Sequence, residues 1–258
     1  MTLRTTTAAA LAALALAAPP AGAHEFLVEP AATEAGPDVS VAFEVLSTHV
    51  FFEPEEMEAA SSVEVVLVAA DGTTPVTIEE DEAAQVLRGR VAGTGETAWL
   101  AAHRLGQVWS RTPEGWVEGG RDAAPDAEFT GEYEKFAKVL LNAEPGSEVA
   151  MRPIGQALEI VPLTDPGDLA AGQALEVQVL HDGEPVEATV SASFDGFSDR
   201  PNTYAYLTET VDDEARGPVA TIEPWSAGLW LVRAEHRTAD TPGVDEHVLR
   251  SVMIVAVE

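Results

Sequence analysis

The chain of 258 residues carries 44 acidic side chains against 14 basic ones, a formal net charge of −30, and it contains no cysteine. So negative a surface repels phosphate backbones and anionic lipid, which excludes nucleic acid as a partner. The lack of cysteine excludes disulfides, thiolate metal sites and a cysteine nucleophile, so we expect the fold to be stabilised by apolar burial.

Residues 1–23 have the pattern of an export signal. Arg4 precedes an apolar run of alanine and leucine from Ala8 to Ala18, and Ala21-Gly22-Ala23 resembles a cleavage site of small residues. The run is shorter than the roughly 20 residues of a membrane-spanning helix. We therefore expect a signal peptide over 1–23, a periplasmic or secreted protein that is not membrane-embedded, and a mature chain that begins at His24.

Residues 24–128 predict an N-terminal β-sandwich domain. A turn at Ala35-Gly36-Pro37-Asp38 precedes Val39, Val41, Phe43 and Val45, whose period of two predicts a half-buried strand. Short apolar runs over 63–68, 76–78, 86–91 and 97–103 predict further strands, and a Thr112-Pro113-Glu114-Gly115 turn predicts an aromatic hairpin. Many short strands at this spacing are typical of a β-sandwich.

The next segment, 129–154, departs from this pattern. Apolar residues at helical spacing within Phe129–Ala143 predict a short amphipathic helix, and Pro145-Gly146 would end it. About seven apolar runs follow over 155–258, the count expected of an immunoglobulin-like or prealbumin-like sandwich. The sequence thus predicts an all-β protein of two β-sandwich domains with one short helix between them.

Several segments look familiar in their order along the chain: His24–Pro30, Thr112–Trp116, Glu134–Lys138, Leu158–Leu163, Val179–Pro185 and Ala227–Val232. Together they resemble an exported bacterial family, a domain of unknown function often labelled a periplasmic component of nickel or cobalt uptake. The resemblance covers essentially the whole mature chain; it departs from the family at Asp212–Gly217, where an Asp-Gly turn is common. It implies a nickel or cobalt ion as ligand and a membrane metal transporter as partner.

The six histidines form no closely spaced pair, so a metal site must be assembled by the fold. His181 lies in a predicted turn and His247 at a strand start, and both are expected at the surface. The candidate metal ligands are His24, His49, His103 and His236.

His24 is the strongest candidate, because a free α-amine with a pKa of about 7.7–8.0 deprotonates easily and would chelate an ion together with its own imidazole. Such nitrogen ligands suit nickel, cobalt, copper or zinc, and the intrinsic affinity order favours copper. Glu25 or Glu29 could add an oxygen ligand.

Two other functions stay open. A histidine-brace copper protein would be a copper chaperone or an oxidative enzyme, and a non-metal β-sandwich interaction module would dock on a transporter or polymer. The sequence contains no Gly-x-Ser-x-Gly elbow and no phosphate-binding glycine loop, so it predicts no catalytic residue. We therefore expect metal binding without chemistry of its own, and blocking His24 would separate the metal-binding functions from the interaction module.

Overall fold

The computed structural model describes residues 24–37, 39–239 and 241–258, and the predicted signal peptide lies outside them. The first half of the described chain forms β1 (Glu25–Pro30), β2 (Ser40–Thr48), η1 (Ala60–Ser62), β3 (Val63–Ala69), β4 (Gly72–Pro75), β5 (Ile78–Asp81), β6 (Val86–Ala92), β7 (Ala98–Thr112), β8 (Gly115–Glu118) and β9 (Phe129–Leu141). The second half forms α1 (Glu148–Met151), β10 (Leu158–Pro162), η2 (Pro166–Asp168), β11 (Leu175–His181), β12 (Glu184–Pro185), β13 (Thr189–Phe194), β14 (Tyr206–Glu209), β15 (Val211–Asp213), β16 (Gly217–Ile222), β17 (Gly228–Thr238) and β18 (Glu246–Val257). The prediction of an all-β protein is confirmed.

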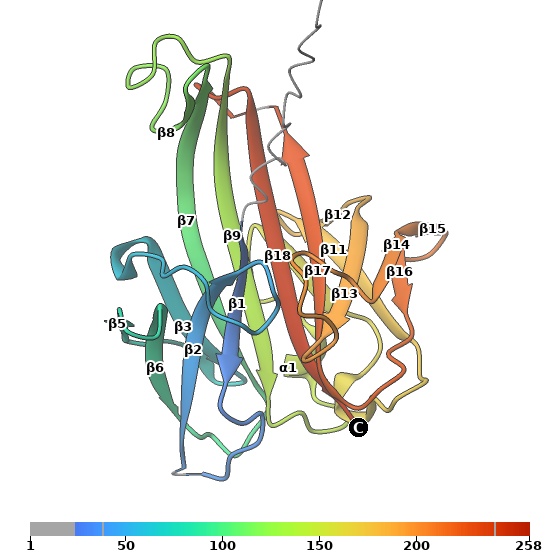
Figure 1. Cartoon of the computed structure of the whole chain (residues 1–258). Helices are drawn as coiled ribbons and strands as arrows, with labels where there is room; N and C mark the ends of the chain where they lie inside the picture. The colour runs from blue at the N-terminus through green and yellow to red at the C-terminus, as the bar shows by residue number, and fades with distance from the viewer. Residues whose placement is uncertain (1–23, 38, 240) are drawn as a thin grey trace, which may run out of the picture.

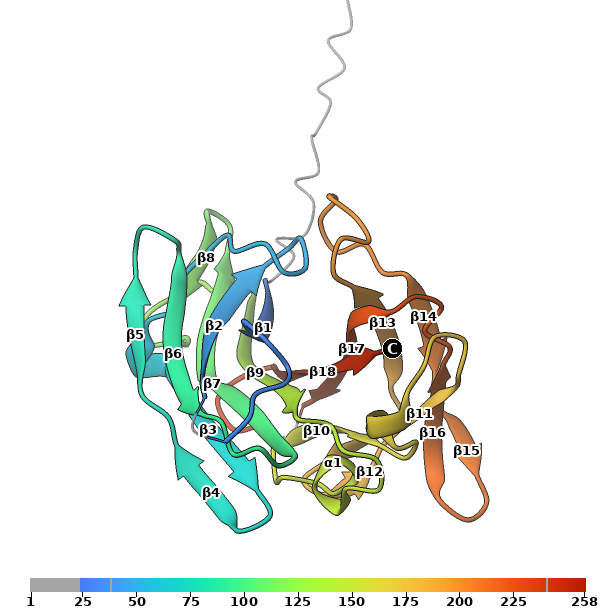
Figure 2. The same cartoon turned by 90° about the horizontal axis from the view of Figure 1, so that it is seen from below.

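The described strands form three sheets, and the largest runs through both halves of the chain. Its order is β14-β13-β17-β18-β9-β7-β3-β4, with β8 paired to β7 (Figure 1). The seam between the halves is the parallel pairing of β18 with β9, from Glu246–Gly131 to Ile254–Val139. The smaller sheets have the orders β1-β2-β6-β5 and β10-β11-β16-β15, and they lie on either side of the molecule (Figure 2).

Two apolar cores lie on the two faces of this large central sheet. The first core packs Phe26, Phe43 and Leu87 of the β1-β2-β6-β5 sheet against residues such as Leu100 and Val139. The second core packs β10, β11 and β16 against residues such as Trp99, Phe136 and Trp230. The fold is therefore a pair of sandwiches that share one sheet.

The helix predicted within Phe129–Ala143 is wrong, because this segment is the strand β9. Alternate residues of β9 enter different cores: Phe136 and Leu140 enter the second, and Ala137, Val139 and Leu141 enter the first. A strand buried on both faces has no apolar–polar alternation, and its nearly continuous apolar run can mimic helical spacing. The short helix of the linker is α1, which the sequence did not indicate.

A buried ion pair fixes the chain between α1 and β10. Lys138 Nζ lies 2.6 Å from Glu159 Oε1, and both side chains are at most 1% exposed. Glu159 also accepts hydrogen bonds from the backbone amides of Ile154, Gly155 and Gln156 at 2.8–3.3 Å. The carboxylate is thus satisfied by both the ammonium and the turn that precedes β10.

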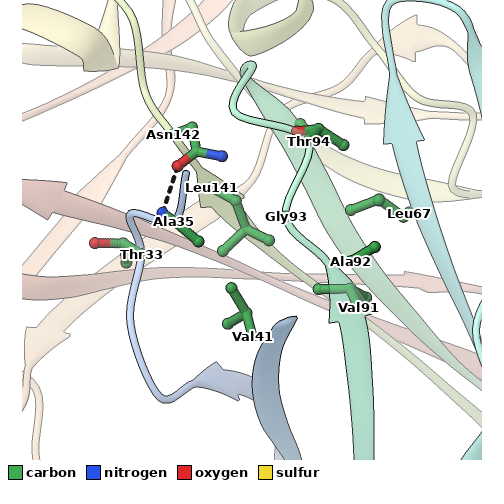
Figure 3. Close-up of a pocket in the computed structure, with 11 residues that line it drawn as sticks. Thr33, Ala35, Val41, Leu67, Val91, Ala92, Gly93, Thr94, Leu141 and Asn142 are labelled. Atoms are coloured by element: carbon green, nitrogen blue, oxygen red, sulfur yellow. Dashed lines mark hydrogen bonds between the residues drawn. The ribbon is translucent and has the colours of Figure 1, made fainter. Parts of the chain in front are cut away.

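A small hollow lies near the start of β2, at the opposite end of that strand from His49 (Figure 3). Its lining includes Val41, Leu67 and Leu141. Asn142 Oδ1 accepts a hydrogen bond from the Ala35 amide at 2.7 Å across its rim. Its mostly apolar lining contains none of the histidines. Among the residues that the structure describes, no helix has the length and apolar character needed to cross a membrane.

Candidate metal centre

The pairing of β1 with β2 brings His24 and His49 together. The antiparallel register runs from Pro30–Phe43 to Glu25–Thr48, and one further step places His24 opposite His49. Their ring centroids are 4.0 Å apart with the planes tilted by 44°. Two residues that are 25 positions apart in the sequence therefore become neighbours at one end of the four-stranded sheet.

The acidic loop that follows His49 folds back over the pair. The amides of Glu55 and Glu56 both donate to the carbonyl of Ser47 at 3.2 Å, which returns the loop to the end of β2. Glu55 Oε2 then lies 2.6 Å from His49 Nδ1 and 3.6 Å from His24 Nε2. Glu56 Oε2 lies 2.9 Å from His24 Nδ1.

His24, His49 and Glu55 could together hold a metal ion. Each offers a ligand atom, and the three atoms lie within 4.8 Å of one another. The side chains are 27%, 25% and 34% exposed, so an ion has access from solvent. Two imidazoles and a carboxylate are a common ligand set for transition metals in proteins.

The surroundings keep the His24 imidazole in the form that binds metal. Burial lowers the pKa of His24, the nearby His49 lowers it further, and the Glu56 carboxylate offsets only part of the shift. A lowered pKa leaves the ring neutral at pH 7, with one nitrogen lone pair available. Glu56 contacts Nδ1, which leaves Nε2 directed at Glu55, as in the carboxylate–histidine–metal arrangements of known metal sites.

A second carboxylate anchors the acidic loop to the central sheet. Glu58 Oε1 accepts a hydrogen bond from Ser47 Oγ at 2.8 Å and from Lys135 Nζ at 3.2 Å. Burial raises the pKa of Glu58, but the charges of Lys135 and Arg104 outweigh it and hold the pKa below its ordinary value. The loop that carries Glu55 is therefore attached at both of its ends.

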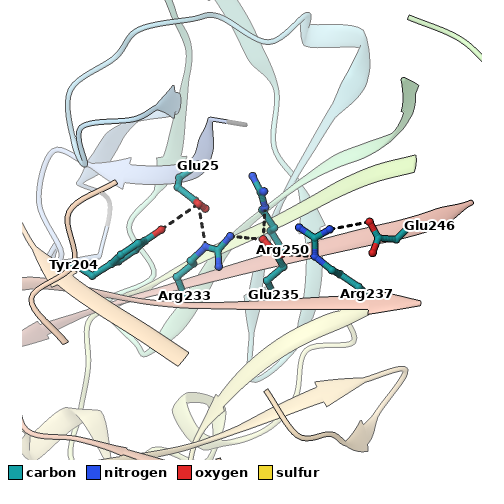
Figure 4. A network of polar contacts seen from close by, with 7 residues as sticks. All are labelled: Glu25, Tyr204, Arg233, Glu235, Arg237, Glu246 and Arg250. Atoms are coloured by element: carbon teal, nitrogen blue, oxygen red, sulfur yellow. Dashed lines mark hydrogen bonds and ion pairs between the residues drawn. The ribbon is translucent and has the colours of Figure 1, made fainter. Parts of the chain in front are cut away.

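A chain of ion pairs fixes the start of β1. Glu25, the residue after His24, accepts from Arg233 Nε at 3.0 Å and from Tyr204 Oη at 3.3 Å. Arg233 continues the network along β17 and β18 to further charged residues, namely Glu235, Arg237, Glu246 and Arg250 (Figure 4). Glu25 is thus committed to holding β1 against the central sheet and is not placed as a metal ligand.

The structure does not bring His103 or His236 to the His24–His49 pair. Both lie on the strand positions that face the second core, on the other side of the central sheet. His103 Nε2 lies 2.6 Å from Glu134 Oε1, and His247 Nε2 lies 3.1 Å from the other oxygen of the same carboxylate. His236 lies beside His181, with ring centroids 4.6 Å apart.

Sequence reasoning missed Glu55 and Glu56 as members of the site. They lie in the acidic run Glu53–Glu58, which the sequence identifies only as a loop, and with 44 acidic residues no single carboxylate stands out. A signal for the histidine pair did exist. A hairpin centred on the predicted turn 35–38 pairs residue i with residue 73 − i, and this rule pairs 24 with 49.

Comparison with known proteins gives a family and little else. A family model described as "Domain of unknown function (DUF4198)" matches residues 21–238. No curated protein matches the sequence.

Two solved structures show a distant likeness. The adhesin FdeC of Escherichia coli is 13% identical over 92% of this chain, with a TM-score of 0.25, and the chain spans 65% of the adhesin chain's length. A mouse coronavirus receptor-binding domain in complex with its murine receptor is 12% identical over 91% of this chain and 99% of that chain, with a TM-score of 0.21. At these TM-scores neither likeness carries an argument about function.

Proposed function

The chain belongs to the DUF4198 family, a domain of unknown function, and we propose that it binds a divalent transition-metal ion through His24, His49 and Glu55. The observation that supports the proposal is the convergence of these three ligand atoms within 4.8 Å at a solvent-accessible strand end. Nickel or cobalt is the proposed cargo, in line with the family resemblance, and copper or zinc would suit the same ligands.

Binding requires small movements and a shift of one ring proton. Ligand atoms bound to one ion at about 2.1 Å lie roughly 3 Å apart. Glu55 Oε2 lies 2.6 Å from His49 Nδ1 and 3.6 Å from His24 Nε2, so both separations would change slightly on binding. To bind an ion through Nδ1, a neutral His49 would give up its contact with Glu55 and carry its ring proton on Nε2. Glu56 and Glu58 would orient His24 and the loop without contacting the ion.

The proposed start of the mature chain at His24 would add a second mode of binding. An amino-terminal chelate uses the α-amine together with Nδ1 of the same histidine, whereas Nδ1 of His24 here lies against Glu56. The chelate therefore needs the imidazole to leave Glu56, and the side-chain site does not. Export to the periplasm, removal of residues 1–23 and delivery to a membrane transporter complete the proposed role.

Isothermal titration with Ni²⁺, Co²⁺, Cu²⁺ and Zn²⁺ tests the proposal, in excess Mg²⁺ so that the many surface carboxylates are occupied. His49→Ala and Glu55→Gln should each weaken the binding of one ion. The loss of affinity should exceed the roughly 10–100-fold that is typical when a residue outside the ligand set is replaced. His247→Gln is the matched control, because His247 contacts Glu134 on the other side of the sheet. Failure of all four metals to bind at this site more tightly than about 10 μM would reject the proposal.

Two protein forms separate the modes of binding. Protein that starts at His24 and protein with one glycine placed before it should bind equally well if the side chains alone hold the ion. A large loss in the second form would instead assign the α-amine as a ligand. Strong preference for copper in the first form would favour the histidine-brace alternative over nickel or cobalt handling.

A further inference from the structure

A second pair of histidines lies at the rim of the other sandwich. His181 is the last residue of β11 in the five-stranded sheet, and His236 lies two residues before the end of β17 in the central sheet. These two sheets enclose the second core, so the imidazoles meet across its open end. Their ring centroids are 4.6 Å apart and the planes are tilted by 39°.

Little besides proximity holds this pair. Within the described part of the chain, the His236 side chain contacts the His181 ring and has no hydrogen-bond or ion-pair partner. His181 Nε2 lies 3.7 Å from Asp182 Oδ2, whose side chain is 75% exposed. The ring nitrogens of His236 are therefore not committed to any protein group, and the pair is open to solvent.

The other histidines on this side of the sheet differ in this respect. His103 and His247 each direct Nε2 at one oxygen of Glu134, and the His103 ring stacks on Phe136 at 4.6 Å with the planes 17° apart. These contacts give one ring nitrogen of each imidazole a carboxylate partner. The His181–His236 pair has no such explanation.

The spacing of the two rings is that of imidazoles sharing one ion. Nitrogens bound at about 2.1 Å with an angle of about 90–110° at the metal place the ring centroids about 4.5–5.2 Å apart. The observed 4.6 Å falls inside this range. Two tilted rings in contact without an ion gain only a weak attraction, and His181 disfavours protonation of His236.

We propose that His181 and His236 bind a second divalent transition-metal ion, with water completing its coordination. Burial and the neighbouring His181 lower the pKa of His236, which keeps its lone pair available at neutral pH. The ion joins the end of β11 to the end of β17 and so ties the two sheets of the second sandwich together. The imidazole-rich ligand set suits copper, nickel or zinc.

The test uses Cu²⁺ as the probe on the full protein, in excess Mg²⁺. His24→Ala/His49→Ala protein, which lacks both the first site and the amino-terminal chelate, should still bind one Cu²⁺, and Cu²⁺ should broaden the imidazole NMR resonances of His181 and His236. Adding His236→Gln to that protein should abolish this binding, whereas adding His247→Gln should leave it unchanged. Circular dichroism of each variant confirms that it is folded.

Two outcomes overturn the inference. One is a His24→Ala/His49→Ala protein that binds no Cu²⁺, and the other is binding that survives the additional His236→Gln change. The two proposals fail in different ways, because His236→Gln alone should leave the first ion in place. If His49→Ala leaves the number and affinity of bound ions unchanged while His236→Gln removes the binding, the first proposal is wrong and this one stands.

Discussion

The Lys138–Glu159 pair predicts a strongly non-additive loss of stability. Glu159→Gln leaves a buried ammonium without its counter-charge, and breaking a buried ion pair in this way costs about 3–5 kcal/mol. The ammonium lies 4.6 Å from the centroid of the Trp99 ring, which compensates little of this loss. Lys138→Met should cost less, about 2–3 kcal/mol, because the carboxylate keeps its three backbone donors.

The double variant Lys138→Met/Glu159→Gln contains no buried charge, and its amide oxygen can still accept from the turn 154–156. Replacing a buried pair by neutral groups is often close to neutral, so the double variant should cost about 2–4 kcal/mol less than the sum of the single ones. Urea unfolding at pH 7, followed by both tryptophan fluorescence and circular dichroism, gives the three values and tests two-state behaviour. Single costs that add to within about 0.5 kcal/mol would refute the reasoning.

Three further predictions concern stability. At pH values above 7, Glu29→Gln should unfold at a higher urea concentration than the unsubstituted protein, because it removes a buried negative charge. The difference should disappear as the pH falls to 4.5, because burial and two neighbouring carboxylates raise the pKa of Glu29 from 4.5 to about 7 and the carboxyl is then protonated in the folded protein. Glu134→Gln should lower the midpoint at pH 7, with the difference narrowing below pH 4.5, because the hydrogen bond from a histidine lowers the pKa of Glu134 and its stabilising charge is lost on protonation. Gly89→Ala should lower the free energy of unfolding by about 1–3 kcal/mol, because a Cβ at this position overlaps the buried Phe43 ring. Gly36→Ala is the control: its Cβ meets no atom within 4 Å, so the stability should change little. Equal urea midpoints for the two alanine variants would contradict this prediction.

The parts of the fold that the sequence predicts are those with one buried face. Strand β2 was predicted from alternation, and its apolar positions Val41, Phe43 and Val45 do enter the first core. The turn between β7 and β8 was predicted from Thr112-Pro113-Glu114-Gly115 and lies where expected. Strand β9 was mistaken for a helix because two cores share it, and which of its residues faces which core depends on strands more than 100 residues away.

The candidate site shows the same limit. His24 and His49 lie on adjacent strands of one hairpin, so a local pairing rule is enough to join them. His103 follows the run Ala98–Ala102, which is apolar at every position, so the pattern of that run does not tell which face of the sheet His103 lies on. His181 was expected at the surface as a turn residue, but the contact with His236 depends on how two sheets pack, which no local pattern encodes.

The shared sheet explains why the histidines divide into two groups. A sheet buried on both faces has little room for polar side chains except near its rims, and five of the six histidines lie within two residues of a strand end. Strand β17 shows the division most clearly, since Arg233 and Glu235 lie in the ion-pair network beside the first core, and His236 follows with its side chain on the opposite face.

Packed sheets lie about 10 Å apart, so ions at the two rims would be separated by at least the thickness of the central sheet. At such separations substitutions act independently to within about 0.5 kcal/mol. Under the two proposals we therefore predict that His49→Ala and His236→Gln each remove one ion independently, and strong coupling between the two pairs would mean that the central sheet changes shape on binding.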